Sequence, residues 1–458
     1  MQLSNRNKGR IGATLCLVTA NLFSTTGLVQ AQEVQNAFDE PATNGPGNII
    51  MDGAVMYYRE NNSRIQAIEP MASYTDYADN GDIFSIKLTA DSLSGASPFG
   101  ATPWIAPQNF LSPTSVTISG DDGSTGASGG VVVTDPVTQM KILQTTAKAN
   151  ELPLNPGFQD TRGAANLSYT KALASRTRVT FNLNGSIERD YQSYSGGASI
   201  AQDFNNKTTT ISVGVNYQHD LSKRLYGTPT PFAVMTGVFT DGTKSENIVS
   251  ATAGITQVIT RNWLVQLNYS YERATGYQNN PYKVISVLDP VTGAPQRYLY
   301  EARPDKRTRN AVYIGSKLAV GSFVTNLSAR YYHDSWGINS ITANASEHIP
   351  IGTRGYIEPG VRYYHQSSAD FFNYFLLSNA ALPQFASADN RLDKFNAITA
   401  SIKGGYMLND QIELYAMADY YSQTKAGTKG LLPGNNGSLN LFAGVKAISV
   451  MTGVKYRF

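Results

Sequence analysis

The sequence predicts an all-β protein: a single antiparallel transmembrane β-barrel of about sixteen strands, with short periplasmic turns and long extracellular loops. Three observations lead to this fold class. The chain opens with a segment typical of a secretory signal, many later segments alternate between apolar and polar residues, and the last strand ends on Phe458. Such alternation is typical of barrels in the outer membrane of Gram-negative bacteria. Fourteen strands remain possible if the first hairpin lies outside the barrel.

The N-terminal segment has the three parts of a secretory signal. The first ten residues carry three bases and no acid, and a mostly apolar stretch from Ile11 to Val18 follows. A more polar tail then ends at Ala31, a small residue suited to cleavage. We therefore expect residues 1–31 to be removed and residues 32–458 to form the barrel domain. A buried N-terminal helix is the alternative interpretation.

Removing the signal changes the bulk composition. Its three bases account for the formal charge of +3, so the mature chain balances 34 bases against 34 acids, and no charge excess predicts a nucleic-acid partner. Cys16, the only cysteine, leaves with the signal, which excludes disulfides and thiolate metal sites. The mean hydropathy of −0.26, with no later run of roughly 18 apolar residues, excludes a helical membrane protein.

Period-two alternation locates the strands. In the stretch 178–191, for example, apolar Phe181 and Leu183 alternate with polar Asn182 and Asn184. The sixteen predicted strands lie near residues 49–60, 63–72, 80–92, 158–171, 176–191, 207–219, 230–240, 246–259, 262–274, 306–320, 322–335, 338–349, 353–366, 392–407, 410–424 and 446–458. The even number places both termini in the periplasm.

The closing strand sets the direction of all the others. Its apolar face consists of Ile448, Val450, Thr452, Val454, Tyr456 and Phe458. We expect Tyr456 and Phe458 to be the assembly signal that the barrel-assembly machinery reads. Counting back from this end makes 192–206 an outward loop and 220–223 a periplasmic turn. The alternation of turns and loops then requires a strand at 230–240, although its own pattern is weak.

Pairs of adjacent tyrosines give a second indication of the membrane boundary. They fall near the outer ends of predicted rising strands, at Tyr57-Tyr58, Tyr331-Tyr332, Tyr363-Tyr364 and Tyr420-Tyr421. An interfacial aromatic girdle would place them there. Because tyrosine is favoured in any sheet, ordinary strand aromatics are the alternative.

The long connection at residues 93–157 has two interpretations. Prolines break its first half, and the stretch 120–130 is rich in Gly, Asp and Ser. It contains apolar residues that could be buried, namely Phe99, Trp104, Ile105, Phe110 and Leu111. We expect partial folding into the lumen as a constriction or plug; a mobile surface loop is the alternative.

Charged residues project to the inner face of the predicted strands. The candidate lumen-lining residues are Arg162, Arg178, Glu188, Asp190, Glu272, Arg307, Arg309, Lys317, Arg330, Arg354, Glu358, Arg362, Lys403, Glu413 and Asp419. A base facing lipid near the midplane would cost roughly 2–4 kcal/mol, so the lumen is the favoured location. Two hypotheses remain open: a ladder of ion pairs that closes the lumen, and a basic pore that favours anions.

Sequence motifs for catalysis, cofactors and metals are absent. The chain contains no G-x-S-x-G, H-E-x-x-H, P-loop or C-x-x-C-H segment. Of the four histidines, His219 and His348 are expected near the periplasm, and His333 and His365 follow tyrosine pairs at the outer ends. The latter two would be roughly 10 Å apart, too far for one metal ion. We predict no enzyme, no metal and no cofactor.

Four short strings carry a family resemblance. They are Ala90–Pro98, Asp160–Arg162, Ile187–Ser193 and Asp203–Thr209. In these strings the chain resembles a family of uncharacterised Gram-negative outer-membrane barrels, known only as a domain of unknown function. The resemblance implies the barrel and its membrane, no settled activity, and in some relatives a link to periplasmic redox proteins. It also implies that some matching residues pack the long loop against the wall: Asp91, Ser92, Asp160, Arg162, Glu188 and Asp190.

Three functional hypotheses follow. The first is a porin-like channel for small solutes, based on the polar inner face. The second is a plugged barrel that serves as a scaffold or conduit for a cell-envelope complex, with periplasmic redox partners as one option. The third, an outer-membrane enzyme, has no motif in its favour. The expected partners are outer-membrane lipid and the assembly machinery, with a periplasmic partner or a homo-oligomer open.

Overall fold

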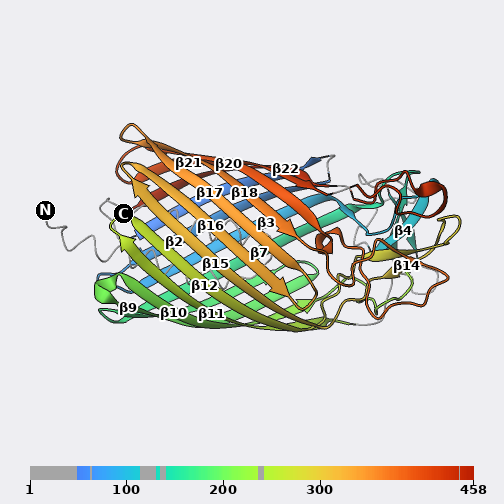
Figure 1. Ribbon diagram of the computed structural model, residues 1–458, viewed down its shortest axis with the longest axis horizontal. Helices are drawn as coiled ribbons and strands as arrows, with labels where there is room; N and C mark the ends of the chain where they lie inside the picture. Colours follow the sequence, from blue (N-terminus) through green and yellow to red (C-terminus); the bar gives the residue numbers. More distant parts are fainter. Residues whose placement is uncertain are drawn as a thin grey trace.

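The computed structural model describes residues 49–61, 64–113, 130–134, 141–235, 242–425, 427–442 and 444–458. They form a closed antiparallel barrel of sixteen strands (Figure 1). The strands are β1 (Ile49–Glu60), β2 (Ile65–Tyr77), β3 (Ile83–Pro98), β7 (Leu154–Ala174), β8 (Thr177–Ile187), β9 (Tyr191–Phe204), β10 (Thr209–Ser222), β11 (Lys244–Thr260), β12 (Trp263–Gly276), β15 (Lys306–Val320), β16 (Phe323–Asp334), β17 (Asn339–Ile351), β18 (Gly355–Gln366), β20 (Phe395–Met407), β21 (Ile412–Thr424) and β22 (Lys446–Arg457). The predicted fold class is confirmed. The predicted signal segment lies outside the described residues.

The first and last strands close the barrel. β1 pairs with β22 in antiparallel register, with Met51 opposite Tyr456, and the backbone N–H of Phe458 donates to the carbonyl of Ile49. The rings of Tyr456 and Phe458 meet edge to face, with centroids 4.4 Å apart. The C-terminal aromatics therefore lie at the seam where the sheet closes.

The predicted total of sixteen barrel strands is correct, although one strand was missed and another was assigned wrongly. Residues 191–204, expected as an outward loop, form β9, and the predicted strand at 230–240 is not part of the barrel, because β10 pairs directly with β11. Within the described part of that stretch, Val234 makes only an isolated bridge to Leu299. The predicted periplasmic turn at 220–223 consequently lies at the outer end of β10.

β9 was not predicted because its glycine and serine residues interrupt the alternation of apolar and polar side chains. Its sequence reads YQSYSGGASIAQDF, with few apolar side chains. A Cβ added to Gly197 would stand 2.7 Å from the backbone carbonyl oxygen of Val215 on β10. It would also stand 2.8 Å from the Asn216 side chain and 3.0 Å from the Asn182 side chain. The glycine is therefore required by the close backbone of β10 and by luminal asparagines on both neighbouring strands, and it does not mark a turn.

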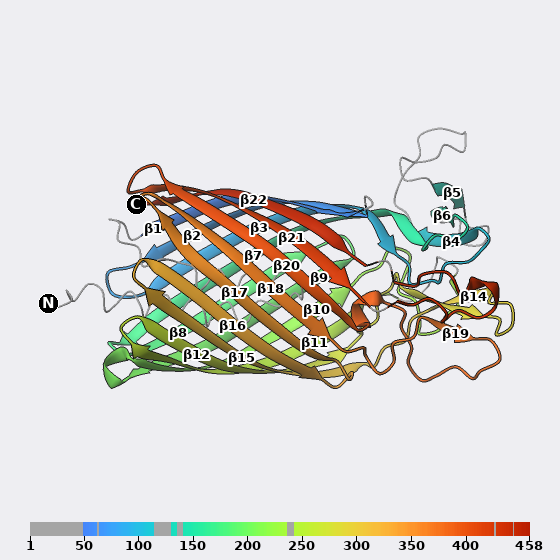
Figure 2. The same cartoon turned by 45° about the horizontal axis from the view of Figure 1, so that its top comes forward.

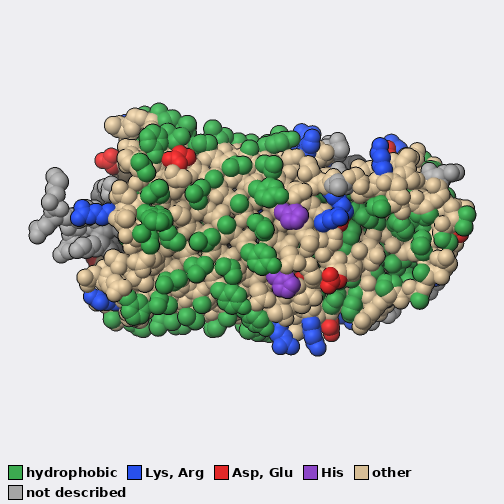
Figure 3. All heavy atoms as spheres, in the orientation of Figure 1, with side chains coloured by type: hydrophobic (Ala, Val, Ile, Leu, Met, Phe, Trp, Pro, Cys, Tyr) green, Lys and Arg blue, Asp and Glu red, His purple; other side chains and the backbone are tan. Residues whose placement is uncertain are grey.

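The outer face of the barrel is apolar. On every strand the large exposed residues alternate with side chains of the opposite face, as with Phe181, Leu183 and Ile187 on β8. Figure 3 shows apolar side chains, in green, spread over the face of the barrel wall that it presents. A belt of this kind is suited to the hydrocarbon of an outer membrane. In the described part of the chain, no helix has the length and apolarity to cross a membrane.

Extracellular connections build a cap beyond the outer rim (Figure 2). One sheet has the order β4 (Gln108–Pro113), β6 (Lys141–Ala147), β5 (Gly130–Thr134), and the other has the order β14 (Pro295–Tyr300), β13 (Val284–Leu288), β19 (Phe375–Leu377). Short 3₁₀ turns occur at η2 (Asn205–Lys207), η3 (Asn390–Leu392) and η4 (Gly434–Asn436). Of these, η2 links β9 to β10 at the periplasmic rim.

The cap has hydrophobic clusters of its own. Phe99 and Phe110 stack with ring centroids 4.8 Å apart and pack against Val284 and Tyr300 of the β12–β15 connection. The expected partial folding of residues 93–157 into the lumen is therefore wrong for this part of the segment, because another loop supplies the apolar partners outside the barrel. Ile105 remains 49% exposed. Residues 114–129 and 135–140 lie outside the described residues.

Candidate functional site

The inner wall is neutral along one side of the barrel. Luminal positions of β8 to β12 carry buried uncharged polar side chains, among them Thr180, Asn182, Ser212, Asn216, Gln266 and Asn268. Hydrogen bonds cross this surface between strands, as between the amides of Asn182 on β8 and Asn216 on β10, 3.4 Å apart across β9. Between its charged ends, this side of the wall is therefore neutral and its polar groups are packed against one another.

Ion pairs occupy the outer part of the wall. Arg162 on β7 binds Asp91 on β3 at 2.5 Å, and Arg307 on β15 binds Asp334 on β16 at 2.5 Å. Arg309 pairs with Glu272 on β12. These residues come from neighbouring strands, so the pairs tie the wall together around the mouth.

A second group of ion pairs lies toward the periplasmic rim. Arg178 donates two hydrogen bonds of 2.9 Å to Asp203, and Arg457 donates one of 2.7 Å to Glu413. The remaining acids accept from hydroxyls: Glu358 from Ser346 at 3.2 Å and Asp419 from Ser449 at 2.8 Å. The hypothesis of an ion-pair ladder therefore describes much of the wall near both rims.

Three bases differ from this pattern and form what we name the luminal cation band: Arg330, Arg362 and Lys403. They lie on β16, β18 and β20, on the strand face opposite the apolar belt. Arg330 and Arg362 are close enough to repel each other electrostatically. Within the described residues, none of the three lies at ion-pair distance from a carboxylate. Arg330 is also exposed.

Aromatic rings accompany the luminal cation band. The Arg330 guanidinium carbon lies 5.8 Å from the centre of the Tyr332 ring. The Lys403 ammonium lies 6.0 Å and 5.9 Å from the ring centres of Tyr356 and Tyr415. Such cation–π contacts stabilise a base without neutralising it. The positive charge thus remains available to a solute.

Glycines hold two of these rings against the wall. A Cβ on Gly405 would stand 2.3 Å from the Tyr356 ring, and a Cβ on Gly453 would stand 2.3 Å from the Tyr415 ring. The Tyr356 hydroxyl donates to Glu413 at 2.9 Å, and the Tyr415 hydroxyl donates to Asp52 at 2.7 Å. The rings therefore line the lumen instead of filling it.

The tyrosine pairs divide between the two faces of the wall. The first member of each pair faces lipid, with exposed fractions of 40% for Tyr57 and 51% for Tyr331. The second member faces the lumen and donates two residues along its strand, Tyr58 to Glu60 at 3.1 Å and Tyr332 to Asp334 at 2.7 Å. Only half of each pair can therefore serve an interfacial girdle.

Three predicted wall residues lie in turns. Glu188 and Asp190 belong to the short outer turn between β8 and β9, and Arg354 to the exposed turn between β17 and β18. Burial raises the pKa of Glu188 to about 7, and the neighbouring carboxylate of Asp160 adds to the effect. Glu188 is thus an acid at the outer mouth whose charge changes near neutral pH.

One repeat in the sequence was overlooked. The string Arg-Tyr-Tyr-His occurs at 330–333 and again at 362–365, on two rising strands separated by β17. Alternation sends Arg and the second Tyr inward, and the first Tyr and His outward. Identical strings two strands apart indicate one layer of the wall, a signal that periodicity alone does not provide.

The histidines do not form a metal site. The prediction that His219 lies near the periplasm is wrong, because β9 reverses the direction of β10 and places it at the outer end with His333 and His365. Each of these three binds an asparagine on the next strand. Within the described residues, no group of three or more His, Cys, Asp or Glu could hold a metal ion.

Solved structures with a similar fold are outer-membrane proteins. A bacterial polysaccharide outer-membrane secretin matches at TM-score 0.41 and 7% identity over 90% of this chain and 99% of its own. The monoaromatic hydrocarbon channel CymD matches at TM-score 0.38 and 8% identity, over 91% and 90%. The siderophore receptor PirA from Acinetobacter baumannii matches at TM-score 0.41 and 10% identity, over 90% of this chain but 60% of its own.

Sequence comparison identifies the family. No curated protein matches the chain. A family model described as "Protein of unknown function (DUF3570)" matches residues 13–458. This span includes the strings that carried the resemblance, all sixteen barrel strands and the cap. The chain therefore belongs to the DUF3570 family.

Proposed function

We propose that the protein is an outer-membrane channel for small solutes and that the luminal cation band makes it prefer anions. One observation carries the proposal: Arg330 projects to the inner face, is exposed, and has no carboxylate partner among the described residues. A guanidinium in such a position attracts anions and repels cations. The neutral middle of the wall from β8 to β12 places no opposing charge beside the band.

The positions of the luminal tyrosines and of the third-strand loop favour space for a solute in the lumen. Tyr356 and Tyr415 lie over glycines, and the apolar residues of the third-strand loop are buried in the cap. The mature chain would reach the membrane after cleavage near Ala31, with its C-terminal strand read by the assembly machinery.

Reversal potentials across planar bilayers test the proposal. The wild-type barrel in a KCl gradient should give a potential of the sign expected for chloride. Arg330→Gln with Arg362→Gln should move that potential toward zero, because both changes remove positive charge from the band. Arg176→Gln with Arg261→Gln is the matched control, since it removes the same charge from exposed turns at the periplasmic rim and should leave the potential unchanged.

The outcomes separate the hypotheses. Absence of conductance at any voltage would exclude a channel, and a wild-type preference for potassium would exclude the anion-selective band.

A plugged scaffold is the second candidate, because the cap is unusually well packed for surface loops. Its clusters join the β3–β7 connection to the β12–β15 connection, and Ile285 and Leu288 are fully buried there. Pro98 faces Leu154 across the β3–β7 pair, so a short Gly-Ser linker could replace residues 99–153. If only this shortened barrel conducts, the cap closes the pore and the scaffold hypothesis gains support.

A further inference from the structure

The lipid-facing side of the outer end carries a repeated polar triad. In each case a Tyr and a His, two residues apart on a rising strand, share the side-chain oxygen of one Asn on the next strand. The triads are Tyr217-His219-Asn247, Tyr331-His333-Asn339 and Tyr363-His365-Asn396. The Asn oxygen lies 2.7–3.0 Å from the Tyr hydroxyl and 2.8–2.9 Å from His Nδ1. Hydrogen bonds thus hold polar side chains in place at the outer end of the lipid-facing side, where apolar side chains alone would be enough to contact lipid.

Hydrogen bonding fixes the orientation of the imidazoles. Asn339 donates its amide N–H to the carbonyl of Gly337 at 3.3 Å, so its oxygen is the acceptor for both Tyr331 and His333. His333 Nδ1 must then carry a proton, which leaves Nε2 as the ring nitrogen available to a ligand. His333 and His365 are both exposed.

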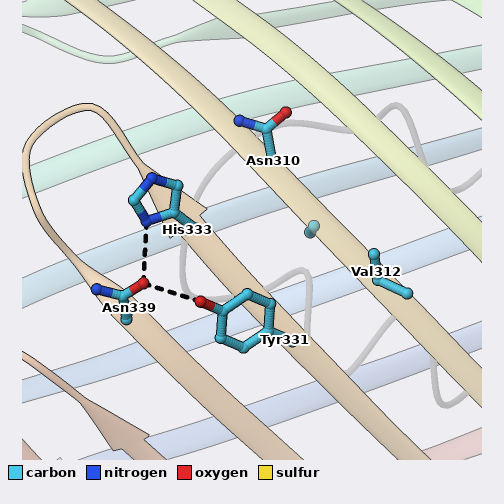
Figure 4. A pocket seen from close by; sticks show the side chains of 6 residues that line it. Asn310, Val312, Tyr331, His333 and Asn339 are labelled. Carbon is cyan, nitrogen blue, oxygen red and sulfur yellow. Dashed lines mark hydrogen bonds between the residues drawn. The ribbon is translucent and has the colours of Figure 1, made fainter.

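A hollow of about 400 Å³ lies beside the middle triad. Its lining includes Asn310 and Val312 of β15 together with Tyr331, His333 and Asn339 (Figure 4). Asn310 faces His333 across the β15–β16 pair and accepts from Tyr269 of β12 at 2.7 Å. The hollow therefore combines an apolar side with several polar groups.

Four exposed bases lie on the lipid-facing side of their strands, either level with the triads or closer to the cell surface. We name them the outer basic belt: Arg59, Arg273, Lys306 and Lys446. Arg59 lies diagonally across the strand pair from Lys446, and Arg273 lies diagonally from Lys306. Within the described residues none of them has an ion-pair partner. Figure 3 shows histidine and basic side chains where the apolar belt ends.

We infer that this outer margin binds phosphate groups on the headgroups of outer-leaflet lipids. Like charges on neighbouring strands repel, and an anion between them relieves the repulsion. The belt of apolar side chains directly below would contact the acyl chains of the same lipid. Bases near a membrane surface bind anionic lipid with about 1 kcal/mol each. This inference is independent of whether the lumen conducts.

Native mass spectrometry of the full mature barrel in zwitterionic nanodiscs tests the inference. The probe is bisphosphorylated lipid A, compared with the same lipid after removal of its phosphates. Arg273→Gln with Lys306→Gln is the test variant, and Arg176→Gln with Arg261→Gln is the matched control. The control removes the same charge from exposed positions at the periplasmic rim.

The expected loss is roughly fivefold per base, or about 30-fold for the test variant. The control variant should bind like the wild type, and dephosphorylated lipid A should bind the wild type weakly. His333→Phe, which keeps a ring but removes the ring nitrogens, should give a smaller loss. Equal binding by the test and control variants, or equal binding of both lipids, would overturn the inference. Heat-shifted migration on gels verifies that each variant is folded.

Discussion

The ring of Tyr356 on β18 lies over Gly405 on β20, directly opposite it in the strand register. A Cβ at position 405 would stand 2.3–2.6 Å from three atoms of that ring. The glycine therefore determines how far the aromatic side chain extends into the lumen.

Gly405→Val should displace the Tyr356 ring into the lumen and lower single-channel conductance by about twofold. Gly404→Val is the control, because a Cβ there meets only the Tyr356 carbonyl oxygen, at 3.7 Å. Adding Tyr356→Ala to Gly405→Val should restore conductance, since the displaced ring is gone. Unchanged conductance in the single variant would mean that the ring does not limit the path.

Anion permeability should fall between pH 6 and pH 8 in the wild type. The pKa of Glu188 is raised to about 7, so the residue is neutral below this pH and negative above it. The negative form adds to the charge of nearby Asp160 at the outer mouth and repels entering anions. Glu188→Gln should weaken this pH dependence, whereas Glu151→Gln, an exposed acid of the cap, should retain it in full. A pH response that survives undiminished in Glu188→Gln would assign it to another group.

Asp389→Asn should open the cap while leaving the barrel folded. Burial alone would raise the pKa of Asp389, but the charges of Arg391, Lys283 and Arg303 hold it well below its usual range. Removing this carboxylate takes a compensating charge from buried Lys283 and leaves Arg303 with Glu301 alone, at a cost of up to about 3–5 kcal/mol. Limited proteolysis should cut the cap faster in this variant than in Asp370→Asn, whose side chain is exposed. Equal cutting would show that the network is dispensable.

Deleting Phe458 should reduce the yield of folded barrel severalfold. Its backbone N–H donates to Ile49 across the closing seam, and its ring packs on Tyr456. The measurement is the heat-modifiable fraction in isolated outer membranes. Phe323→Ala, which removes a lipid-facing ring on β16, five strands away from β22, should fold normally. A normal yield after deletion would contradict the proposed assembly role of the terminus.

Sequence patterning predicted the barrel because its strands obey a local rule. Alternation such as that of β8 can be recognised in one segment without knowing its neighbours. It failed at β9, where Gly197 makes room for Asn182 and Asn216, side chains from two other strands. The strand assigned at 230–240 came from parity and not from pattern, and it was wrong.

The cap and the candidate site were harder to predict because their partners are distant in sequence. Phe99 was recognised as buriable, but nothing local indicates Val284 as its neighbour. The charges of the luminal wall were visible, yet their pairing depends on register. Arg307 meets Asp334 while Arg330 meets no described carboxylate, and alternation alone does not distinguish the two.

The division of each tyrosine pair has a consequence for where solutes are selected. Tyr331 anchors the outer face at the membrane boundary, and Arg330, one residue before it, is in the luminal cation band. One strand residue spans only about 3.3 Å, so Arg330 and Arg362 must follow the lipid boundary closely, whereas Lys403 lies deeper, opposite Glu358. A thicker or thinner bilayer would change the length of the path below the band but not its depth from the cell surface. Solutes would therefore be sorted on entry, before most of the membrane has been crossed.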